Sequence, residues 1–130
     1  MKSILLIEDD PDILENLVEY LEMEGFRIFS ANTAEKGIEL AAQIIPDLII
    51  CDTPKPGIDG YEVLRFIVNT TDTCEIPFIF CTTLCQNFYK TEAYELGADG
   101  FIIKPFELEK ILQLARNCMK QGSKRQKYML

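Results

Sequence analysis

The residues in this chain best suited to chemistry are carboxylates that directly follow runs of apolar residues. Asp52 follows the apolar residues 48–51, and Glu8 and Asp9 follow the apolar residues 4–7. Carboxylates that are held close together repel one another, and a hard divalent cation such as Mg²⁺ relieves that repulsion. A carboxylate can also attack phosphorus and form an aspartyl phosphate. These residues therefore indicate metal-assisted phosphoryl transfer to Asp52.

Two further polar residues end apolar runs and complete this set. Thr82 follows residues 77–81, and Lys104 follows residues 101–103. An ammonium group can pair with one phosphoryl oxygen as a point charge, and a hydroxyl can donate a hydrogen bond to another. Taken singly, Thr82 is typical of a strand residue and Lys104 of a loop lysine. Their common position at the ends of different strands favours one shared site.

Segments typical of strands and of helices alternate along the chain. The predicted strands are residues 3–8, 26–31, 47–52, 77–81 and 101–103, and the predicted helices are residues 11–24, 34–45, 61–69, 86–96 and 107–120. Five such βα units predict an α/β fold, with a doubly wound parallel sheet and helices on both of its faces. The carboxyl ends of all strands then lie on one edge, which is where sheets of this kind bind ligands.

Local signals indicate where two of the helices begin. Asp10 stands directly before a proline, which predicts that it is the N-cap of the first helix. Asp59 and Glu62 have the spacing of a capping box, which predicts that the third helix begins at Tyr61.

The distribution of charge divides the chain into an acidic body and a basic end. After Glu109 there are no acids, and the basic residues are Lys110, Arg116, Lys120, Lys124, Arg125 and Lys127. Removing these six positive charges from the net charge of −8 leaves −14 on the first 109 residues. Such a body repels nucleic acid, so we expect no direct nucleic-acid partner. The basic end is either a final helix with cations at its negative pole or a linker or docking segment.

Composition also excludes several classes of site. The chain has no histidine, which excludes imidazole metal sites, histidine-based catalytic triads and a role as a phosphohistidine carrier. Its five cysteines form no CxxC pair, and Cys51 and Cys81 fall within apolar runs, so we predict buried free thiols. No apolar run is long enough to span a bilayer and no signal peptide is evident, so we expect a cytoplasmic protein without a membrane partner.

In combination, these motifs resemble the receiver domain of two-component response regulators, the CheY-like family. The resemblance runs in order from residue 3 to about 120 and rests on residues 4–10, Asp52 with residues 56–57 and 59–60, Thr82, residues 97–99 and residues 104–106. It implies a flavodoxin-like (βα)5 fold with strand order 2-1-3-4-5. It also implies a receiver domain over residues 1–121, followed by a basic tail or linker over residues 122–130.

The resemblance implies a phosphorylation site at the carboxyl edge of the sheet. Asp52 matches the phosphoacceptor, which receives its phosphoryl group from a histidine kinase or a histidine phosphotransfer protein. Glu8 and Asp9 match the acidic pair that binds Mg²⁺, with Asp9 as the more direct ligand, together with Asp52 and the backbone carbonyl of Pro54. The protein would catalyse its own phosphorylation and slow dephosphorylation without being a turnover enzyme.

The resemblance also implies a switch. Thr82 and Lys104 match the pair that senses the phosphoryl group, and Phe101 matches the aromatic residue that moves on activation. The face made by the fourth helix, fifth strand and fifth helix would then change its preference for a downstream output protein or domain, or for a second copy in a phosphorylation-dependent homodimer.

Four residues beside the predicted site depart from the family's usual pattern or bear on hydrolysis. Lys55 and Thr83 are unusual, and they keep open an alternative in which the fold is a phosphorylation-independent interaction module. In this family, the positions of Pro54 and Leu84 flank the path of the hydrolytic water, and neither side chain can orient a water molecule. We therefore predict a long-lived aspartyl phosphate. A phosphatase of the haloacid-dehalogenase type would need a second aspartate where Pro54 stands.

Overall fold

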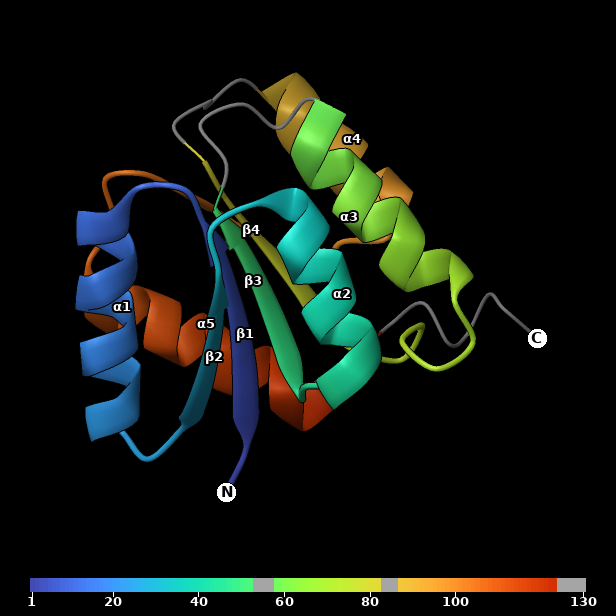
Figure 1. The fold of residues 1–130 in the computed structure, drawn as a ribbon. Coiled ribbons are helices and arrows are strands. Elements are labelled where there is room, and N and C mark those ends of the chain that lie inside the picture. Colours follow the sequence, from blue (N-terminus) through green and yellow to red (C-terminus); the bar gives the residue numbers. More distant parts are fainter. Residues whose placement is uncertain (53–57, 83–86, 124–130) are drawn as a thin grey trace.

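Five strands and five helices alternate along the chain in the computed structural model, which describes residues 1–52, 58–82 and 87–123 (Figure 1). The strands are β1 (Ser3–Glu8), β2 (Arg27–Ala31), β3 (Leu48–Asp52), β4 (Phe78–Thr82) and β5 (Gly100–Ile103). The helices are α1 (Pro11–Met23), α2 (Ala34–Ile44), α3 (Ile58–Asn69), α4 (Asn87–Leu96) and α5 (Leu108–Gln121). The predicted alternation of strands and helices is confirmed.

The strands form one parallel sheet in the order β2-β1-β3-β4-β5. The chain moves outward from β1 to β2 and then returns to the other side of β1, so the predicted doubly wound, flavodoxin-like fold is confirmed. The register pairs Glu8 with Asp52 and Asp52 with Cys81. The carboxyl ends of the three central strands therefore lie level with one another.

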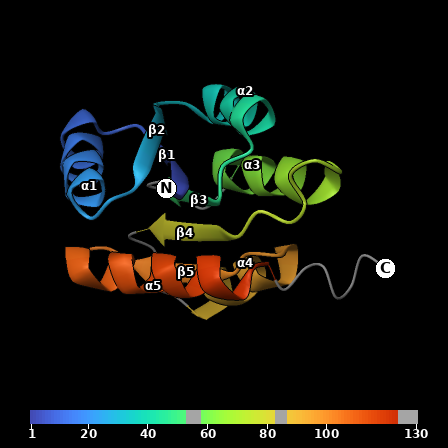
Figure 2. The ribbon, with the colours of Figure 1, turned by 90° about the horizontal axis from the view of Figure 1, so that it is seen from below.

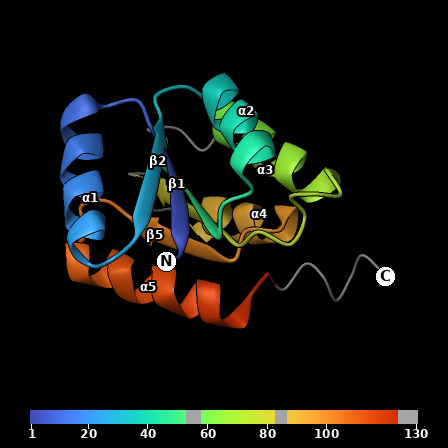
Figure 3. The same ribbon diagram turned by 60° about the horizontal axis from the view of Figure 1, so that its bottom comes forward.

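The strands read as unbroken apolar runs because helices cover both faces of the sheet. One core cluster joins the sheet to α1 and α5, and the other joins it to α2, α3 and α4. Figure 2 shows α2 and α3 beside each other and α1 on the other side of β1, while Figure 3 shows the first part of α5 next to α1. Alternate residues point to opposite faces, since Leu6 and Ile50 pack toward α1 and α5 whereas Ile7 and Cys51 pack toward α2 and α3.

The start of α1 agrees with its local signal. The carboxylate of Asp10 accepts hydrogen bonds from the backbone N–H groups of Asp12 at 2.9 Å and Ile13 at 3.3 Å. Asp10 is therefore the N-cap of α1, as predicted. The helix is followed by Gly25, whose φ of +94° lies in the left-handed region that glycine adopts readily.

The start of α3 differs from the prediction. The helix begins at Ile58, three residues before Tyr61, so Asp59 lies within the first turn and the predicted capping box is wrong. Gly57 and Gly60 flank this point in the sequence, and glycine favours turns. Packing overrides that local preference, because Tyr61, Leu64 and other residues of the helix are buried against the sheet.

Two aspartates accept hydrogen bonds from other segments of the chain at the amino end of the sheet. Asp47 Oδ2 accepts hydrogen bonds from the backbone N–H of Ser3 at 2.8 Å and from its hydroxyl at 3.2 Å. Asp99 Oδ2 accepts one from the N–H of Phe78 at 3.0 Å, and its Oδ1 accepts one from the hydroxyl of Ser123 at 3.4 Å. Ser123 is buried, so the chain stays packed against the domain just beyond α5.

The cysteines that the structure describes form no disulfide. Cys51 and Cys81 are buried, as predicted, and they belong to core clusters on opposite faces of the sheet. Burial, reinforced by the nearby charge of Asp52, raises the pKa of the Cys81 thiol well above its usual range. None of the described helices combines the length and the apolar character needed to cross a bilayer.

Candidate functional site

Three charged side chains meet at the carboxyl edge of the sheet. Glu8 and Asp52 end adjacent strands at paired positions, and each directly follows a residue that faces α2 and α3. Lys104, directly after β5, forms ion pairs with Oδ1 of Asp52 and with Oε2 of Glu8, the latter at 3.5 Å. The side chains of Asp52 and Glu8 are only 1% and 2% exposed, and that of Lys104 is 16% exposed.

The positive charge of Lys104 does not fully compensate the negative charges of Glu8 and Asp52. Burial raises the pKa of Glu8 to about 8, and the neighbouring carboxyl group of Asp52 adds to this rise. The backbone N–H of Asp10 and the charge of Lys104 oppose it only in part. Burial alone would lower the pKa of Lys104, but its hydrogen bond to Asp52 and the charges of Asp52 and Glu8 raise it overall. Lys104 is therefore a permanent cation beside one carboxylate that ionises only with difficulty.

This donor set fits a small, hard cation. Asp52 Oδ2 and Glu8 Oε2 are buried oxygens that accept no hydrogen bond from the part of the chain that the structure describes. Across those residues, no three histidine, cysteine or acidic side chains form a metal-binding group. Mg²⁺ needs no such group, because it is commonly held by one or two carboxylates and keeps several waters. Glu8 and Asp52 satisfy that requirement.

The other predicted site residues lie at or near the same edge. Thr82 is buried at the end of β4, and its backbone carbonyl accepts a hydrogen bond of 2.7 Å from the N–H of Lys104. Asp9 follows Glu8 but is exposed and takes no part in the ion pairs around Lys104. Phe101 is half-buried on β5 and packs against the core cluster of α2, α3 and α4. The predictions for residues 54, 55, 83 and 84 lie outside the described residues.

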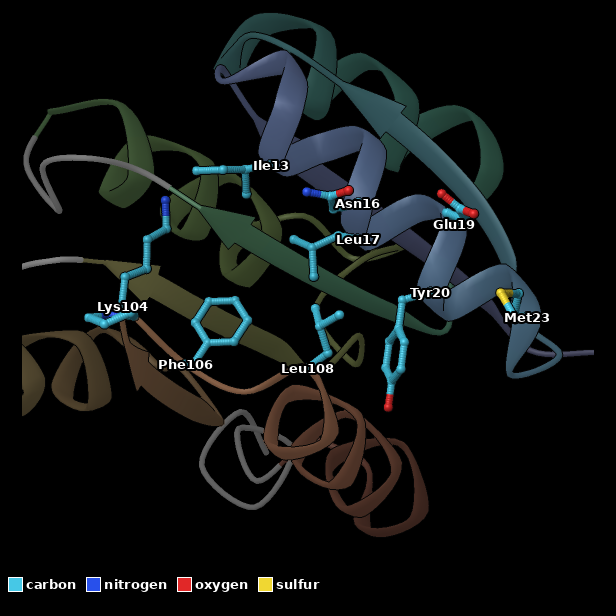
Figure 4. A pocket seen from close by; sticks show the side chains of 10 residues that line it. Ile13, Asn16, Leu17, Glu19, Tyr20, Met23, Lys104, Phe106 and Leu108 are labelled. Carbon is cyan, nitrogen blue, oxygen red and sulfur yellow. The ribbon is translucent and has the colours of Figure 1, made fainter.

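A groove of about 690 Å³ opens beside this site, between α1 and the segment that joins β5 to α5. Figure 4 shows Lys104 and Ile13 at one end of the groove and Met23 at the other. The lining is mostly apolar, and Met23 is 80% exposed. Lys104 both lines the groove and pairs with Asp52, so the groove begins where the charged site ends.

Two features of the site were not predicted from the sequence. One is the groove, whose walls come from segments about 90 residues apart in the chain. The other is a hydrogen bond of 2.9 Å that the backbone N–H of Asp10 donates to Oε1 of Glu8. The only sequence signal for it is a third acid directly after Glu8 and Asp9, which was assigned to helix capping alone.

Comparison with known proteins agrees with this geometry. The sequence profile of the response regulator receiver domain matches residues 4–116. The DNA-binding dual master transcriptional regulator RpaA of Synechocystis sp. is 36% identical over 121 residues, which cover 93% of this chain and 50% of that protein. Protein PilH of Pseudomonas aeruginosa is 31% identical over 113 residues, which cover 87% of this chain and 93% of PilH.

Solved structures give the same result. The receiver domain of HemR from Leptospira biflexa matches with a TM-score of 0.81 and 31% identity, covering 92% of this chain and 94% of that one. A signal receiver domain of a histidine kinase from Syntrophus aciditrophicus matches with a TM-score of 0.83 and 29% identity, covering 93% and 92%.

The chain therefore belongs to the receiver domain family of two-component response regulators. Domains of this class signal through phosphorylation and work with histidine kinases and output domains. The chain spans about half the length of the first curated relatives that it matches, 50% and 54% in two cases.

Proposed function

We propose that this protein accepts a phosphoryl group on Asp52 from a phosphohistidine donor, with Mg²⁺ held by Glu8 and Asp52. The observation that carries the proposal is the buried pair of carboxylates with Lys104 beside it. Asp9, the residue after Glu8, and the backbone carbonyl of Pro54 would contribute further ligands. The receiver domain would comprise residues 1–121, with a basic linker after it, and would switch partners without acting as a turnover enzyme.

In the proposed step, a carboxylate oxygen of Asp52 attacks the phosphorus of the phosphohistidine. A phosphorus–oxygen bond forms as the phosphorus–nitrogen bond breaks, and the imidazole nitrogen keeps the electron pair. The new group adds negative charge to a site in which Lys104 is the cation that the described residues supply. Glu8 and Asp52 would hold Mg²⁺, which would supply the remaining positive charge when bound. Lys104 would pair with a phosphoryl oxygen in place of the oxygen of Asp52 that it now holds.

Phosphorylation would change the conformation of the ends of β4 and β5. The backbone hydrogen bond from Lys104 to Thr82 ties these two ends together. If Thr82 and Lys104 move toward a phosphoryl group, β5, which carries Phe101, and α4, which follows β4 in the chain, would move with them. Tyr94 of α4 and Ile103 of β5 are exposed apolar residues on the face that would change its partner, whether an output domain or a second copy.

Phosphorylation with a small donor tests the proposal. The protein is incubated with acetyl phosphate and Mg²⁺, and its intact mass is measured. We expect the mass of one added phosphoryl group, and none with Asp52→Asn. Asp47→Asn is the matched control, because Asp47 is an acid at the opposite end of the same sheet. No mass change in the folded, Mg²⁺-loaded protein would favour the phosphorylation-independent interaction module instead.

We also propose that the aspartyl phosphate is long-lived, because the side chains of Pro54 and Leu84 cannot orient a hydrolytic water. The decay of the phosphorylated mass after removal of acetyl phosphate measures this lifetime. Pro54→Asn would introduce a side chain able to hydrogen-bond water, and we expect it to shorten the lifetime by about tenfold. An unchanged lifetime in Pro54→Asn, or rapid decay in the unsubstituted protein, would refute this account.

A further inference from the structure

Asp10 makes hydrogen bonds in two directions. Its carboxylate caps α1 by accepting the N–H groups of Asp12 and Ile13, and its carbonyl accepts the N–H of Leu14 at 3.0 Å in the first helical bond. Its own N–H points the other way and donates to Oε1 of Glu8 at 2.9 Å. One exposed residue thus fixes both the first turn of α1 and the orientation of a buried carboxylate.

The bond to Asp10 decides which oxygen of Glu8 faces the charged site. With Oε1 engaged by the N–H, Oε2 is the oxygen that lies 3.5 Å from the ammonium of Lys104. Groups that hold a metal-binding side chain in place raise its affinity for the metal, because less rotational freedom is lost on binding. The N–H of Asp10 can do so only while the first turn of α1 holds it in position.

We propose that Asp10 is a positioning residue for the divalent cation: by capping α1, it holds its backbone N–H against Glu8 and so presents Glu8 Oε2 to the cation. This inference rests on the proposed function, in which Glu8 is a ligand of Mg²⁺. Coupling of this kind is reciprocal. Mg²⁺ should therefore also stabilise the first turn of α1, the helix that forms one wall of the groove in Figure 4.

Two substitutions of Asp10 separate its cap from its charge. Asp10→Asn and Asp10→Ala both remove the charge, but asparagine caps a helix as well as aspartate does and alanine does not. The affinity for Mg²⁺ is measured by calorimetry with no phosphoryl donor present. We expect Asp10→Ala to bind Mg²⁺ about tenfold more weakly than Asp10→Asn. Amide hydrogen exchange should show that Mg²⁺ protects the N–H groups of Asp12 and Ile13 in the unsubstituted protein but not in Asp10→Ala.

The cap of α2 provides the matched control. Thr33 Oγ1 accepts the N–H of Lys36 at 3.1 Å, so Thr33→Ala removes a helix cap away from the acidic site. We expect Thr33→Ala and Asp10→Ala each to lower Tm by about 4 °C, with the affinity for Mg²⁺ unchanged in Thr33→Ala.

Three results would overturn the inference, and they differ in what else they affect. Equal Mg²⁺ affinity in Asp10→Asn and Asp10→Ala would refute the positioning role while leaving the proposed function intact. The same weakening in Thr33→Ala would show a general effect of lost stability. No binding of Mg²⁺ by the unsubstituted protein would refute the metal role of Glu8 and, with it, the role of Asp10.

Discussion

Acidic side chains lie at both ends of the parallel sheet, but their hydrogen-bond and ion-pair partners differ between the two ends. At the amino end, Asp47 and Asp99 accept hydrogen bonds from backbone N–H groups and from serine hydroxyls. At the carboxyl end, Glu8 and Asp52 lie side by side with one lysine between them, and each has a buried oxygen that accepts no hydrogen bond within the described parts of the chain.

This difference separates acids that stabilise the fold from acids that are available for chemistry. A carboxylate that accepts several N–H and O–H hydrogen bonds has its charge compensated and closes a loop. Two carboxylates that share one cation repel each other and remain open to a further positive group. The first helix also begins at the carboxyl end, where its positive pole favours negative charge and phosphate. The uncompensated negative charge of Glu8 and Asp52 destabilises the fold at this end. The same charge lets the site bind a cation and take up a phosphoryl group.

The largest expected effect comes from removing the cation of the carboxyl end. Lys104→Met keeps most of the side-chain volume but leaves Glu8 and Asp52 without their shared partner. We expect the rate of phosphorylation by acetyl phosphate to fall by about 100-fold. Arg116→Met, which removes an exposed ion pair with Glu24, is the control and should leave the rate unchanged. Equal rates in both variants would mean that Lys104 has no part in the transfer.

The amino end should show the opposite pattern, with a loss of stability and no loss of chemistry. Asp99→Ala leaves the buried N–H of Phe78 without the carboxylate that accepts its hydrogen bond. We expect the free energy of unfolding to fall by about 2 kcal/mol, measured by urea denaturation. The phosphorylated mass should still form in acetyl phosphate. If Asp99→Ala abolished phosphorylation while remaining folded, the division between the two ends would be wrong.

A third expected effect is a pH dependence of stability that arises at the carboxyl end of the sheet. Because the pKa of Glu8 is raised to about 8 in the folded protein, the folded state keeps a proton that the unfolded state loses near pH 4.5. Without metal, stability should therefore fall as pH rises from about 5 to about 8, and Tm should fall with it. Mg²⁺ added at pH 8 should reverse the loss.

Two glutamine variants test whether Glu8 causes this fall of Tm with rising pH. Glu8→Gln should remove it, whereas Glu15→Gln, a change at an exposed acid of α1, should retain it. A metal-free protein whose Tm rises over the same pH range would contradict the raised pKa of Glu8.

Much of the fold and the membership of the site could be predicted from the sequence, because the relevant signals are local. The runs at residues 4–7 and 48–51 are apolar at every position, as strands covered on both faces require. The cap at Asp10 depends on its immediate neighbours alone. The start of α3 could not be predicted in this way, because burial of Tyr61 and Leu64 against the sheet outweighs the local turn signal.

The type and order of the residues are enough to define the class of fold and the acids that stand at strand ends, because hydrophobic periodicity and parallel topology follow from them. Long-range contacts are needed to establish that Glu8 lies opposite Asp52, that Lys104 pairs with both, and that Asp10 holds one oxygen of Glu8. Strand register and the path of the chain after β5 are set by long-range packing, and no local pattern encodes them. The amino end shows the same dependence, because the Asp99 bonds to Phe78 and Ser123 join residues more than 20 positions apart.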